Sequence, residues 1–286
     1  NEGVINSGNV VSYKHGTEKP LPSDVTRTGY EFEGWYENSS CIGTAVTVIP
    51  ADAVDPKTFW AKWREKNYNI SFKPNEGTIN DEVVPTQYTF SVGASLPANV
   101  TRNGYAFAGW YDNPEFAGQP VALVRSSDYG NKTYYARWEI KTYTIAFNNN
   151  GGEIGDEVVP SSYIYNKEVE LPSKVYKDGY EFLGWYDNPN FYNDPISKIE
   201  EGDFGNKTFY AKWLVESYDV IFETNGGTIN SGNIAKYTYG VPVNLPTDVI
   251  RTGYTFAGWC SDEALTSERI DAISISDMGE KKFYAK

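Results

Sequence analysis

The sequence has few of the residues on which metal binding, redox chemistry and nucleophilic catalysis depend. Its 286 residues include one His, two Cys and one Met. A Ser–His–Asp or Cys–His arrangement would have to use His15. There is no Cys-x-x-Cys pair, and no phosphate-binding loop of the Gly-x-x-x-x-Gly-Lys-Ser/Thr type. We therefore predict a protein with no catalytic residue, no cofactor and no metal site, which is not an enzyme.

Positive charge is also scarce. The chain has 25 Lys and Arg against 38 Asp and Glu, which gives a net charge of −13. Binding to nucleic acid depends on clustered Lys and Arg, so this balance argues against a nucleic-acid partner. A high negative charge favours a soluble monomer.

Long apolar runs are absent as well. No stretch of 18 apolar residues predicts a transmembrane helix, and the first residues do not form the basic-then-apolar pattern of a secretion signal. If the protein is secreted, we expect its signal and any membrane anchor to lie outside this sequence. The two Cys, Cys41 and Cys260, fall at non-equivalent places and are expected to be isolated thiols.

Aromatic residues, by contrast, make up 16% of the chain and recur at a fixed period. A Gly-Tyr pair occurs four times, at intervals of 75, 75 and 74 residues, and a Gly-Trp pair follows each one five positions later. The Gly-Tyr pairs lie at Gly29-Tyr30, Gly104-Tyr105, Gly179-Tyr180 and Gly253-Tyr254. This period is too long for a solenoid repeat and predicts a string of small folded modules.

We place the four repeats at residues 1–65, 66–140, 141–215 and 216–286. The first repeat lacks the opening strand found in the others, and the last lacks the closing Trp. Both features are expected of a fragment of a longer protein.

Each module is predicted to be rich in β-strands. Its opening strand, such as Tyr68-Asn69-Ile70-Ser71-Phe72, alternates apolar and polar residues, which indicates one buried and one wet face. A Leu-Pro pair follows the second strand, and the segment after it, such as 23–28, is expected to form one short helical turn. Gly before Trp in the third strand indicates a bulge or close backbone approach. Helix content should be low, with a small mixed sheet crossed by one short helix.

The run Arg-x-Gly-Tyr-x-Phe-x-Gly-Trp-Tyr, followed after about 23 residues by Phe-Tyr-Ala-Lys-Trp, resembles the Listeria–Bacteroides repeat, also called the internalin B-repeat. The matching segments are 27–36, 102–111 and 251–259, with Lys177 in place of Arg in the third repeat and Cys260 in place of Tyr in the fourth. The resemblance implies tandem β-grasp-like modules of the ubiquitin type (mainly β, α+β) in an elongated array. It also implies a secreted protein of the bacterial cell surface, similar to adhesins and internalins, and it offers no catalytic residues.

Two kinds of side chain remain as candidate sites. Exposed aromatics that follow the Gly-Trp pair could form a sugar-binding platform, with core packing as the alternative: Tyr36, Tyr111 and Tyr186. The oxygen-rich segment 187–194 could in principle hold calcium, but its spacing does not match an EF-hand loop.

Three functions stay open. The first is adhesion to a host or bacterial surface protein or to a glycan, strengthened by repetition. The second is a mechanical stalk, favoured by short linkers such as 64–67 that lack Gly and Pro. The third is an accessory carbohydrate-binding array of a secreted enzyme. A stalk predicts near-neutral effects of surface aromatic-to-Ala changes, whereas a glycan binder predicts that an aromatic such as Tyr111 controls binding.

Overall fold

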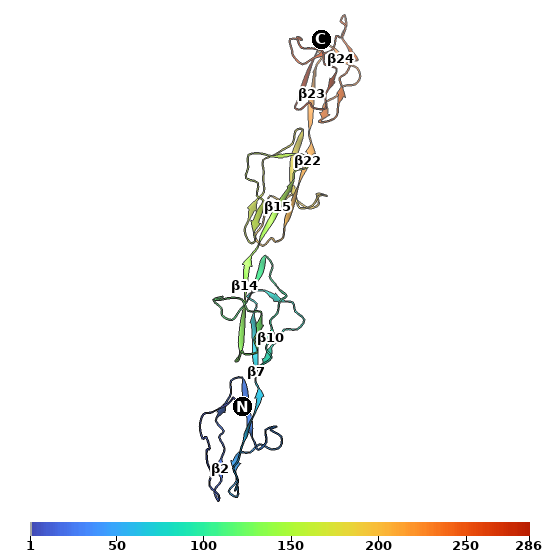
Figure 1. The fold of residues 1–286 in the computed structure, drawn as a ribbon. Coiled ribbons are helices and arrows are strands. Elements are labelled where there is room, and N and C mark those ends of the chain that lie inside the picture. Colours follow the sequence, from blue (N-terminus) through green and yellow to red (C-terminus); the bar gives the residue numbers. More distant parts are fainter. Residues whose placement is uncertain (1) are drawn as a thin grey trace. The chain divides into compact units, whose positions relative to one another are not determined.

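The computed structural model describes residues 2–286, which contain β-strands and no helix. The chain divides into two compact units, residues 1–141 and 142–286, each holding two repeats. Strands of both units are labelled in Figure 1.

The central sheet of a repeat has four strands in a mixed arrangement. In the second repeat the order is β9-β7-β14-β12, in which β7 and β14 are parallel and the two outer pairs are antiparallel. The third and fourth repeats have the same order, β17-β15-β22-β20 and β25-β23-β30-β28. The predicted mixed sheet is therefore confirmed.

Equivalent strands have similar bounds in the different repeats. The opening strands are β7 (Asn67–Lys73), β15 (Thr142–Asn148) and β23 (Ser217–Glu223). The second strands are β9 (Gln87–Thr89), β17 (Ser162–Ile164) and β25 (Lys236–Thr238). The third strands are β4 (Tyr30–Tyr36), β12 (Tyr105–Tyr111), β20 (Tyr180–Tyr186) and β28 (Trp259–Cys260). The closing strands are β6 (Trp60–Glu65), β14 (Lys132–Ile140), β22 (Lys207–Val215) and β30 (Lys281–Ala285).

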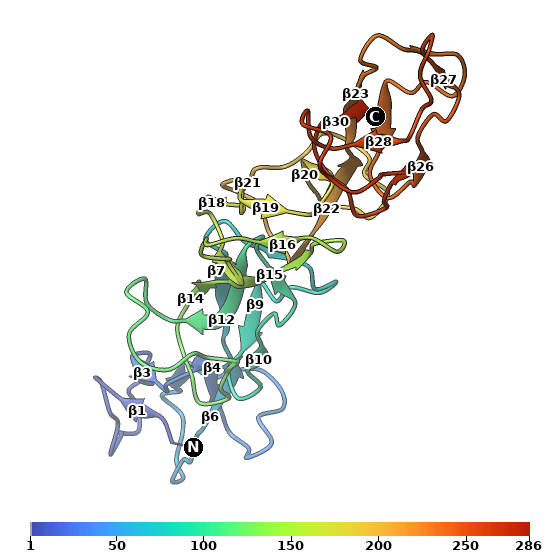
Figure 2. The same ribbon diagram turned by 90° about the horizontal axis from the view of Figure 1, so that it is seen from above.

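Two short antiparallel pairs complete each repeat, and some of these strands are labelled in Figure 2. The first pair joins a short strand that follows the turn after the opening strand to a short strand that follows the Leu-Pro pair. Its members are β1 (Val4–Ile5) with β3 (Val25–Thr26), β8 (Thr78–Ile79) with β11 (Val100–Thr101), β16 (Glu153–Ile154) with β19 (Val175–Tyr176), and β24 (Thr228–Ile229) with β27 (Val249–Ile250). The second pair joins β2 (Lys19–Pro20) to β5 (Val48–Ile49), β10 (Ala94–Ser95) to β13 (Leu123–Val124), β18 (Val169–Glu170) to β21 (Lys198–Ile199), and β26 (Val243–Asn244) to β29 (Ala272–Ile273).

The predicted short helix is wrong for residues 2–286. In the segment 23–28, Val25 and Thr26 form β3, which pairs with β1, and Val25 is buried. A β-branched residue fits a strand better than a helix because its χ1 freedom is restricted. Gly29, at φ +79°, then reverses the chain into β4. The α+β part of the fold prediction therefore fails for the described residues.

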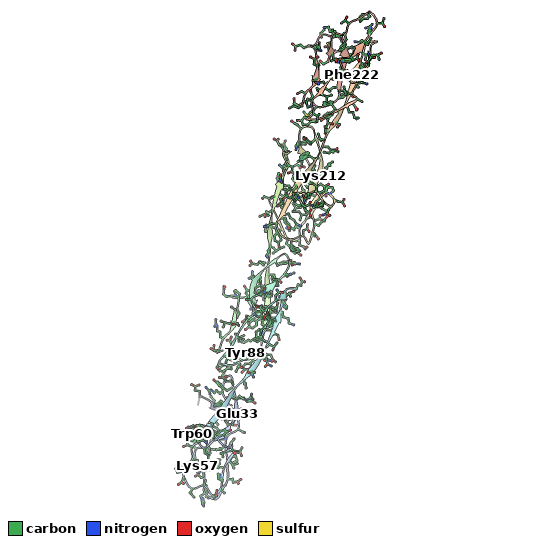
Figure 3. The ribbon with its side chains drawn as sticks, turned by 90° about the vertical axis from the view of Figure 1, so that its right-hand side faces the viewer. Glu33, Lys57, Trp60, Tyr88, Lys212 and Phe222 are labelled. Atoms are coloured by element: carbon green, nitrogen blue, oxygen red, sulfur yellow. The ribbon has the colours of Figure 1, made fainter. Side chains whose placement is uncertain are left out.

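The opening strand alternates as predicted. In β7, Ile70 is buried and Tyr68 and Phe72 are partly buried, whereas the intervening residues are exposed. The phenol of Tyr88 on β9 donates a hydrogen bond to Gly130 O at 2.7 Å. This bond ties the second strand to the loop before β14, and Figure 3 marks Tyr88 among the side chains.

The Gly before Trp lies at a β-bulge, as predicted. The register between β12 and β14 shifts between Phe107 and Gly109. Gly109 has φ +112°, and a Cβ added there would lie 2.5 Å from Pro120 Cβ. The position therefore combines a backbone conformation and a close approach that only Gly satisfies. The bulge recurs in the first and third repeats, before Gly34 and Gly184.

The bulge turns the following Trp into the core. Trp110 is 2% exposed, and its ring centroid lies 4.9 Å from that of Phe72 on the opening strand. Its indole Nε1–H donates to Pro97 O at 2.8 Å, so the buried polar atom has a partner. Trp110 is therefore a core residue of the second repeat.

The first repeat has only part of this sheet. Within the described residues β4 pairs with β6 alone, and no strand stands where the second repeat has β7. Trp35 is consequently only half-buried, unlike Trp110.

Candidate functional site

The aromatics predicted as a ligand platform are not exposed. Tyr36, Tyr111 and Tyr186 are 7%, 4% and 6% exposed, respectively. The ring of Tyr111 meets that of Phe116 edge-on at 5.7 Å, and its hydroxyl accepts a hydrogen bond from Arg137 at 3.3 Å. The structure thus places these rings in packed surroundings, and ligand contact through them stays a prediction.

The remaining candidate groups are scattered. The exposed His15 has Nδ1 3.4 Å from the backbone oxygen of Ala53. Cys41 and Cys260 are both free thiols. Among residues 2–286, no group of three or more His, Cys, Asp or Glu side chains is arranged to hold a metal ion.

The recurrent feature that does emerge is the contact between consecutive repeats, which we call the repeat joint. In the first unit it comprises Gly29 and Tyr30 of the first repeat, Lys66 of the linker and Phe90 of the second repeat. Lys66 N donates to Gly29 O, and Phe90 N donates to Lys66 O, both at 2.9 Å. The linker residue is thus hydrogen-bonded to both repeats through its backbone.

The Phe90 side chain closes this joint. Its ring centroid lies 5.3 Å from that of Tyr30 at an interplanar angle of 71°, a favourable edge-to-face arrangement. A Cβ added to Gly29 would lie 2.3 Å from Phe90 Cγ, so the ring sits directly on the Gly backbone. Gly29 is buried by this contact.

The second unit contains the same joint with different residues. Glu216 N donates to Gly179 O at 2.9 Å, and Tyr239 N donates to Glu216 O at 3.0 Å. The ring centroids of Tyr180 and Tyr239 are 5.8 Å apart at 76°. Recurrence with Tyr for Phe and Glu for Lys shows that the joint depends on backbone bonds and on an aromatic ring, and not on the charge of the linker.

A cation supports the joint tyrosine from within its own repeat. Arg27 Cζ lies 3.9 Å from the ring centroid of Tyr30, and Lys177 Nζ lies 4.3 Å from that of Tyr180. Arg27 also pairs with Glu2 at 2.8 Å. The cation therefore fixes one side of the ring that the next repeat contacts.

The fourth repeat shows the same half of a joint uncovered. Arg251 Cζ lies 4.0 Å from the ring centroid of Tyr254. Tyr254 is 67% exposed, and no atom lies within 4 Å of a Cβ added to Gly253. The equivalent Gly29 and Gly179 each lie against an aromatic ring of the next repeat in their unit. The Gly-Tyr pair is therefore the surface that the next repeat covers in a joint.

Sequence reasoning found the Gly-Tyr pair but assigned it no role in linking repeats. The available signal was the aromatic residue that ends the second strand, present as Phe90, Tyr165 and Tyr239 but replaced by His15 in the first repeat. An aromatic that recurs at this place in three of the four repeats is a candidate contact residue.

A small hollow lies beside the cation and tyrosine in both repeats of the second unit. In the third repeat it has a volume of about 430 Å³ and is lined by Asn150, Lys177, Tyr180, Phe191 and Trp213. In the fourth repeat a hollow of about 70 Å³ is lined by the equivalent Asn225, Arg251 and Tyr254. A basic group, an amide and an aromatic face thus recur together at the surface.

The described residues also contain no helix long and apolar enough to span a bilayer.

Comparison with known proteins agrees with the repeat structure. The chain is 30% identical over 286 residues to a protein of Evansella cellulosilytica that carries the provisional name Gly-rich membrane protein, covering 96% of this chain and 31% of that protein. A second protein of this species, provisionally named a membrane protein, is 28% identical over 92% of the chain and 39% of its own length. Internalin H of Listeria monocytogenes is 29% identical over 51% of the chain and 29% of its own length. The chain thus spans less than two fifths of each of these relatives.

The Listeria–Bacteroides repeat domain matches the chain four times, at residues 1–62, 68–137, 143–212 and 218–286. The chain therefore belongs to the Listeria–Bacteroides repeat family.

Proposed function

We propose that this chain is a non-catalytic spacer segment of a bacterial cell-surface protein, in which the two repeats of each unit are held firmly at their joint. The observation that carries the proposal is the linker residue bonded to both neighbours, Lys66 in the first unit and Glu216 in the second. A flexible linker would lack such bonds and would be rich in Gly and Ser. The names of the relatives, which refer to membranes and to an internalin, support a location at the cell envelope.

Measured distances between two repeats of one unit test this function. Nitroxide labels are attached at Ile42→Cys and Val83→Cys, two exposed positions in the first and second repeats, in a Cys41→Ser background. A firm joint gives one narrow distance distribution by pulsed electron paramagnetic resonance. A broad distribution in the otherwise unmodified chain would overturn the spacer function.

The matched variants are Phe90→Ala and Val92→Ala. Phe90→Ala removes the ring that covers Gly29 and should broaden the distribution. Val92 is 72% exposed two residues further on, so its truncation should leave the distribution unchanged.

Adhesion is the second candidate function, and the hollow shared by the third and fourth repeats favours it. Lys177 and Arg251 present a cation on a tyrosine ring beside an Asn, a combination suited to an acidic sugar or a carboxylate. We would measure saturable binding of the labelled chain to cells and to a glycan panel. Loss of binding in both Lys177→Ala and Arg251→Ala, but not in Lys174→Ala on the exposed surface, would support adhesion through these hollows.

We also infer that the central sheet is β-grasp-like. The support is the strand order β9-β7-β14-β12, with its parallel central pair between two antiparallel partners. In the second repeat, β11, which pairs with β8, occupies the part of the chain where a helical turn was expected.

A further inference from the structure

The first and last strands of the second, third and fourth repeats are direct neighbours in the central sheet. In the second repeat β7 begins at Asn67, one residue after the linker residue Lys66, and β14 ends at Ile140. The same neighbours recur as β15 with β22 and as β23 with β30. The chain therefore enters and leaves each of these repeats through two strands that are hydrogen-bonded to each other.

These two strands are parallel, with the same register in each repeat. Residues 70–73 pair with 132–135, 145–148 with 207–210, and 220–223 with 281–284. Tension along the chain pulls the opening strand towards its beginning and the closing strand towards its end. In a parallel pair these pulls run in opposite directions along the strands, so all bonds of the pair are loaded together in shear. In an antiparallel pair the two loaded ends would lie side by side, and the bonds would open one at a time.

Side chains extend the parallel pair at its beginning. Asn131, directly before β14, accepts a hydrogen bond on Oδ1 from Asn69 N at 2.9 Å. In the third repeat Asn206 accepts the equivalent bond from Thr144 N at 3.1 Å. These bonds join the two strands one residue ahead of the four backbone pairs.

Side chains also extend the pair at its far end. Asn75, two residues after β7, donates from Nδ2 to Ala136 O of β14 at 2.8 Å. The indole of Trp138 donates to Pro74 O at 2.9 Å. Both bonds recur in the third repeat, and the bond of the Asn recurs in the fourth. In the second repeat the opening segment is thus joined to the closing strand from residue 69 to residue 75.

An aromatic pair lies across the two strands in each repeat. The ring centroids of Phe72 and Tyr134 are 6.1 Å apart, and the equivalent pairs in the third and fourth repeats are both 5.8 Å apart. Tyr134 and its counterparts Phe209 and Phe283 are buried. A slide of one strand along the other would therefore break hydrogen bonds and also part rings of the core, which exposes apolar surface.

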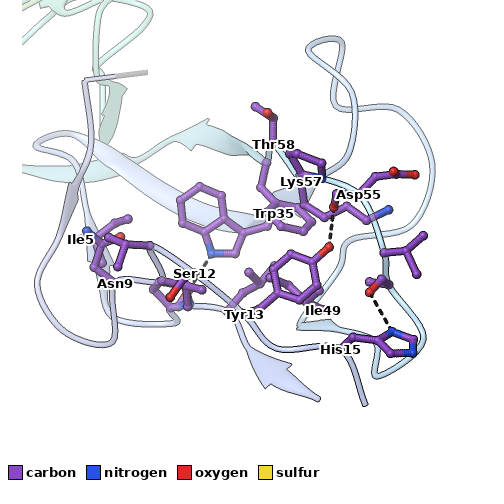
Figure 4. Close-up of a pocket in the computed structure, with 18 residues that line it drawn as sticks. Ile5, Asn9, Ser12, Tyr13, His15, Trp35, Ile49, Asp55, Lys57 and Thr58 are labelled. Carbon is purple, nitrogen blue, oxygen red and sulfur yellow. Dashed lines mark hydrogen bonds between the residues drawn. The ribbon is translucent and has the colours of Figure 1, made fainter. Parts of the chain in front are cut away.

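The first repeat of this chain does not contain such a pair. Its sequence starts at a position equivalent to Asn75, after the place of an opening strand. Among residues 2–286, β6 pairs with β4 alone, and this pair is antiparallel. Figure 4 shows Tyr13 and Trp35 on the lining of the hollow of about 650 Å³ in this repeat. The first repeat is therefore an internal reference for the mechanical behaviour of the other three.

We propose that the second, third and fourth repeats are load-bearing modules, in which the parallel pair of opening and closing strands is a shear clamp that keeps the repeat folded under tension. The inference rests on the spacer function proposed above and goes beyond it, because a spacer needs firm joints, whereas a clamp resists stretching. A surface protein is stretched when one end is held in the cell envelope and the other is held by a bound surface that moves.

Single-molecule force spectroscopy of the whole chain, held by handles at its two ends, tests the clamp. At constant force we expect three long-lived unfolding events, each of which lengthens the chain by roughly 200–250 Å, the extension of one repeat. The first repeat should extend earlier, because it has no parallel pair. Loss of all four repeats with similar, short lifetimes would overturn the proposal.

Two matched variants separate the clamp from overall stability. Asn131→Ala removes a bond between the opening and closing strands. It should shorten the lifetime of one of the three events by about threefold to tenfold, as expected for one hydrogen bond. Thr89→Ala removes the 2.7 Å bond between Thr89 and Asn67, which joins β7 to its antiparallel neighbour β9, and should leave all three lifetimes unchanged. Equal shortening in the two variants would refute the clamp.

A second direction of pulling tests the shear geometry itself. Handles at Lys66→Cys and Val92→Cys, in a Cys41→Ser background, pull at the end of the sheet where β7 begins and β9 ends. This pull opens an antiparallel pair one bond at a time, so the second repeat should unfold sooner than under the same force applied end to end. Equal lifetimes in the two directions would contradict the clamp. Narrow label distances at the joint combined with short lifetimes under force would leave the spacer function standing and refute the clamp alone.

Discussion

The indole of Trp110 donates a hydrogen bond to the carbonyl of Pro97 at 2.8 Å. The same bond joins Trp35 to Pro22, Trp185 to Pro172 and Trp259 to Pro246, each at 2.7 Å. Two motifs that the sequence presents separately, Leu-Pro and Gly-Trp, are therefore partners. Pro lacks an N–H but keeps its carbonyl, which is free to accept because the strand ends there.

Trp110→Phe should destabilise the second repeat by about 2–3 kcal/mol, because it removes a buried indole and leaves the Pro97 carbonyl unpaired. Trp35→Phe is the matched control, since Trp35 makes the same bond but is only half-buried. We expect a cost of about 1 kcal/mol there. Hydrogen exchange of the strand amides in each repeat measures the loss of stability in both variants. Equal losses would contradict the argument that the effect depends on how deeply the indole is buried.

Gly109→Ala should destabilise the second repeat by about 3 kcal/mol. The new Cβ would meet Pro120 at 2.5 Å, and the φ of +112° is unfavourable for an L side chain. Gly118 lies at φ +86°, and no atom lies within 4 Å of a Cβ added there. Gly118→Ala therefore measures the effect of the positive φ alone and should destabilise the repeat by about 1 kcal/mol. Hydrogen exchange of the β12 and β14 amides at increasing urea concentrations would compare the two variants.

Gly29→Ala should loosen the joint of the first unit, since its Cβ would lie 2.3 Å from the Phe90 ring. Gly253→Ala provides a control with an identical φ of +79° and open space around it. We expect faster amide exchange at Lys66 and Phe90 in the first variant, by about tenfold for each 1.4 kcal/mol of stability that the joint loses. Unchanged exchange at these amides would show that the ring contact does not support the joint.

Alkaline pH should unfold the complete repeats. Burial is the main cause that raises the pKa of Tyr88 to about 12, and that of Tyr163 likewise to about 12. An unfolded Tyr titrates near 10. Because the folded pKa is the higher one, this stabilisation is fully present below pH 10 and is lost as pH rises from about 10 to 12.

In the variants Tyr88→Phe and Tyr163→Phe, the stability of the altered repeat should depend less on pH between about 10 and 12. Each variant also loses the hydrogen bond that its Tyr donates, to Gly130 O or to Gly205 O. Circular dichroism against pH measures the effect. A stability that falls already between pH 7 and 9 would point to other groups.

Much of one repeat could be predicted from sequence. The alternation of Tyr68, Ile70 and Phe72 identified a half-buried strand, and Gly109 identified the bulge. The segment 23–28 was misassigned because its local composition is compatible with a turn of helix, whereas its strand state depends on pairing with residues 4–5, about 20 positions away. Likewise, position alone could not show that the ring of Tyr111 packs against Phe116, a residue that lies at φ +55° in the loop after β12.

Residue types at fixed spacing are enough to establish the fourfold repetition, the family, the strand-rich character and the aromatic core. Other features arise only when segments far apart in the chain come together on folding. These include the parallel pairing of β7 with β14 and the covering of Gly29 by Phe90. Residues some 60 positions apart carry no local signal of their contact, so the joint became visible only in the folded chain.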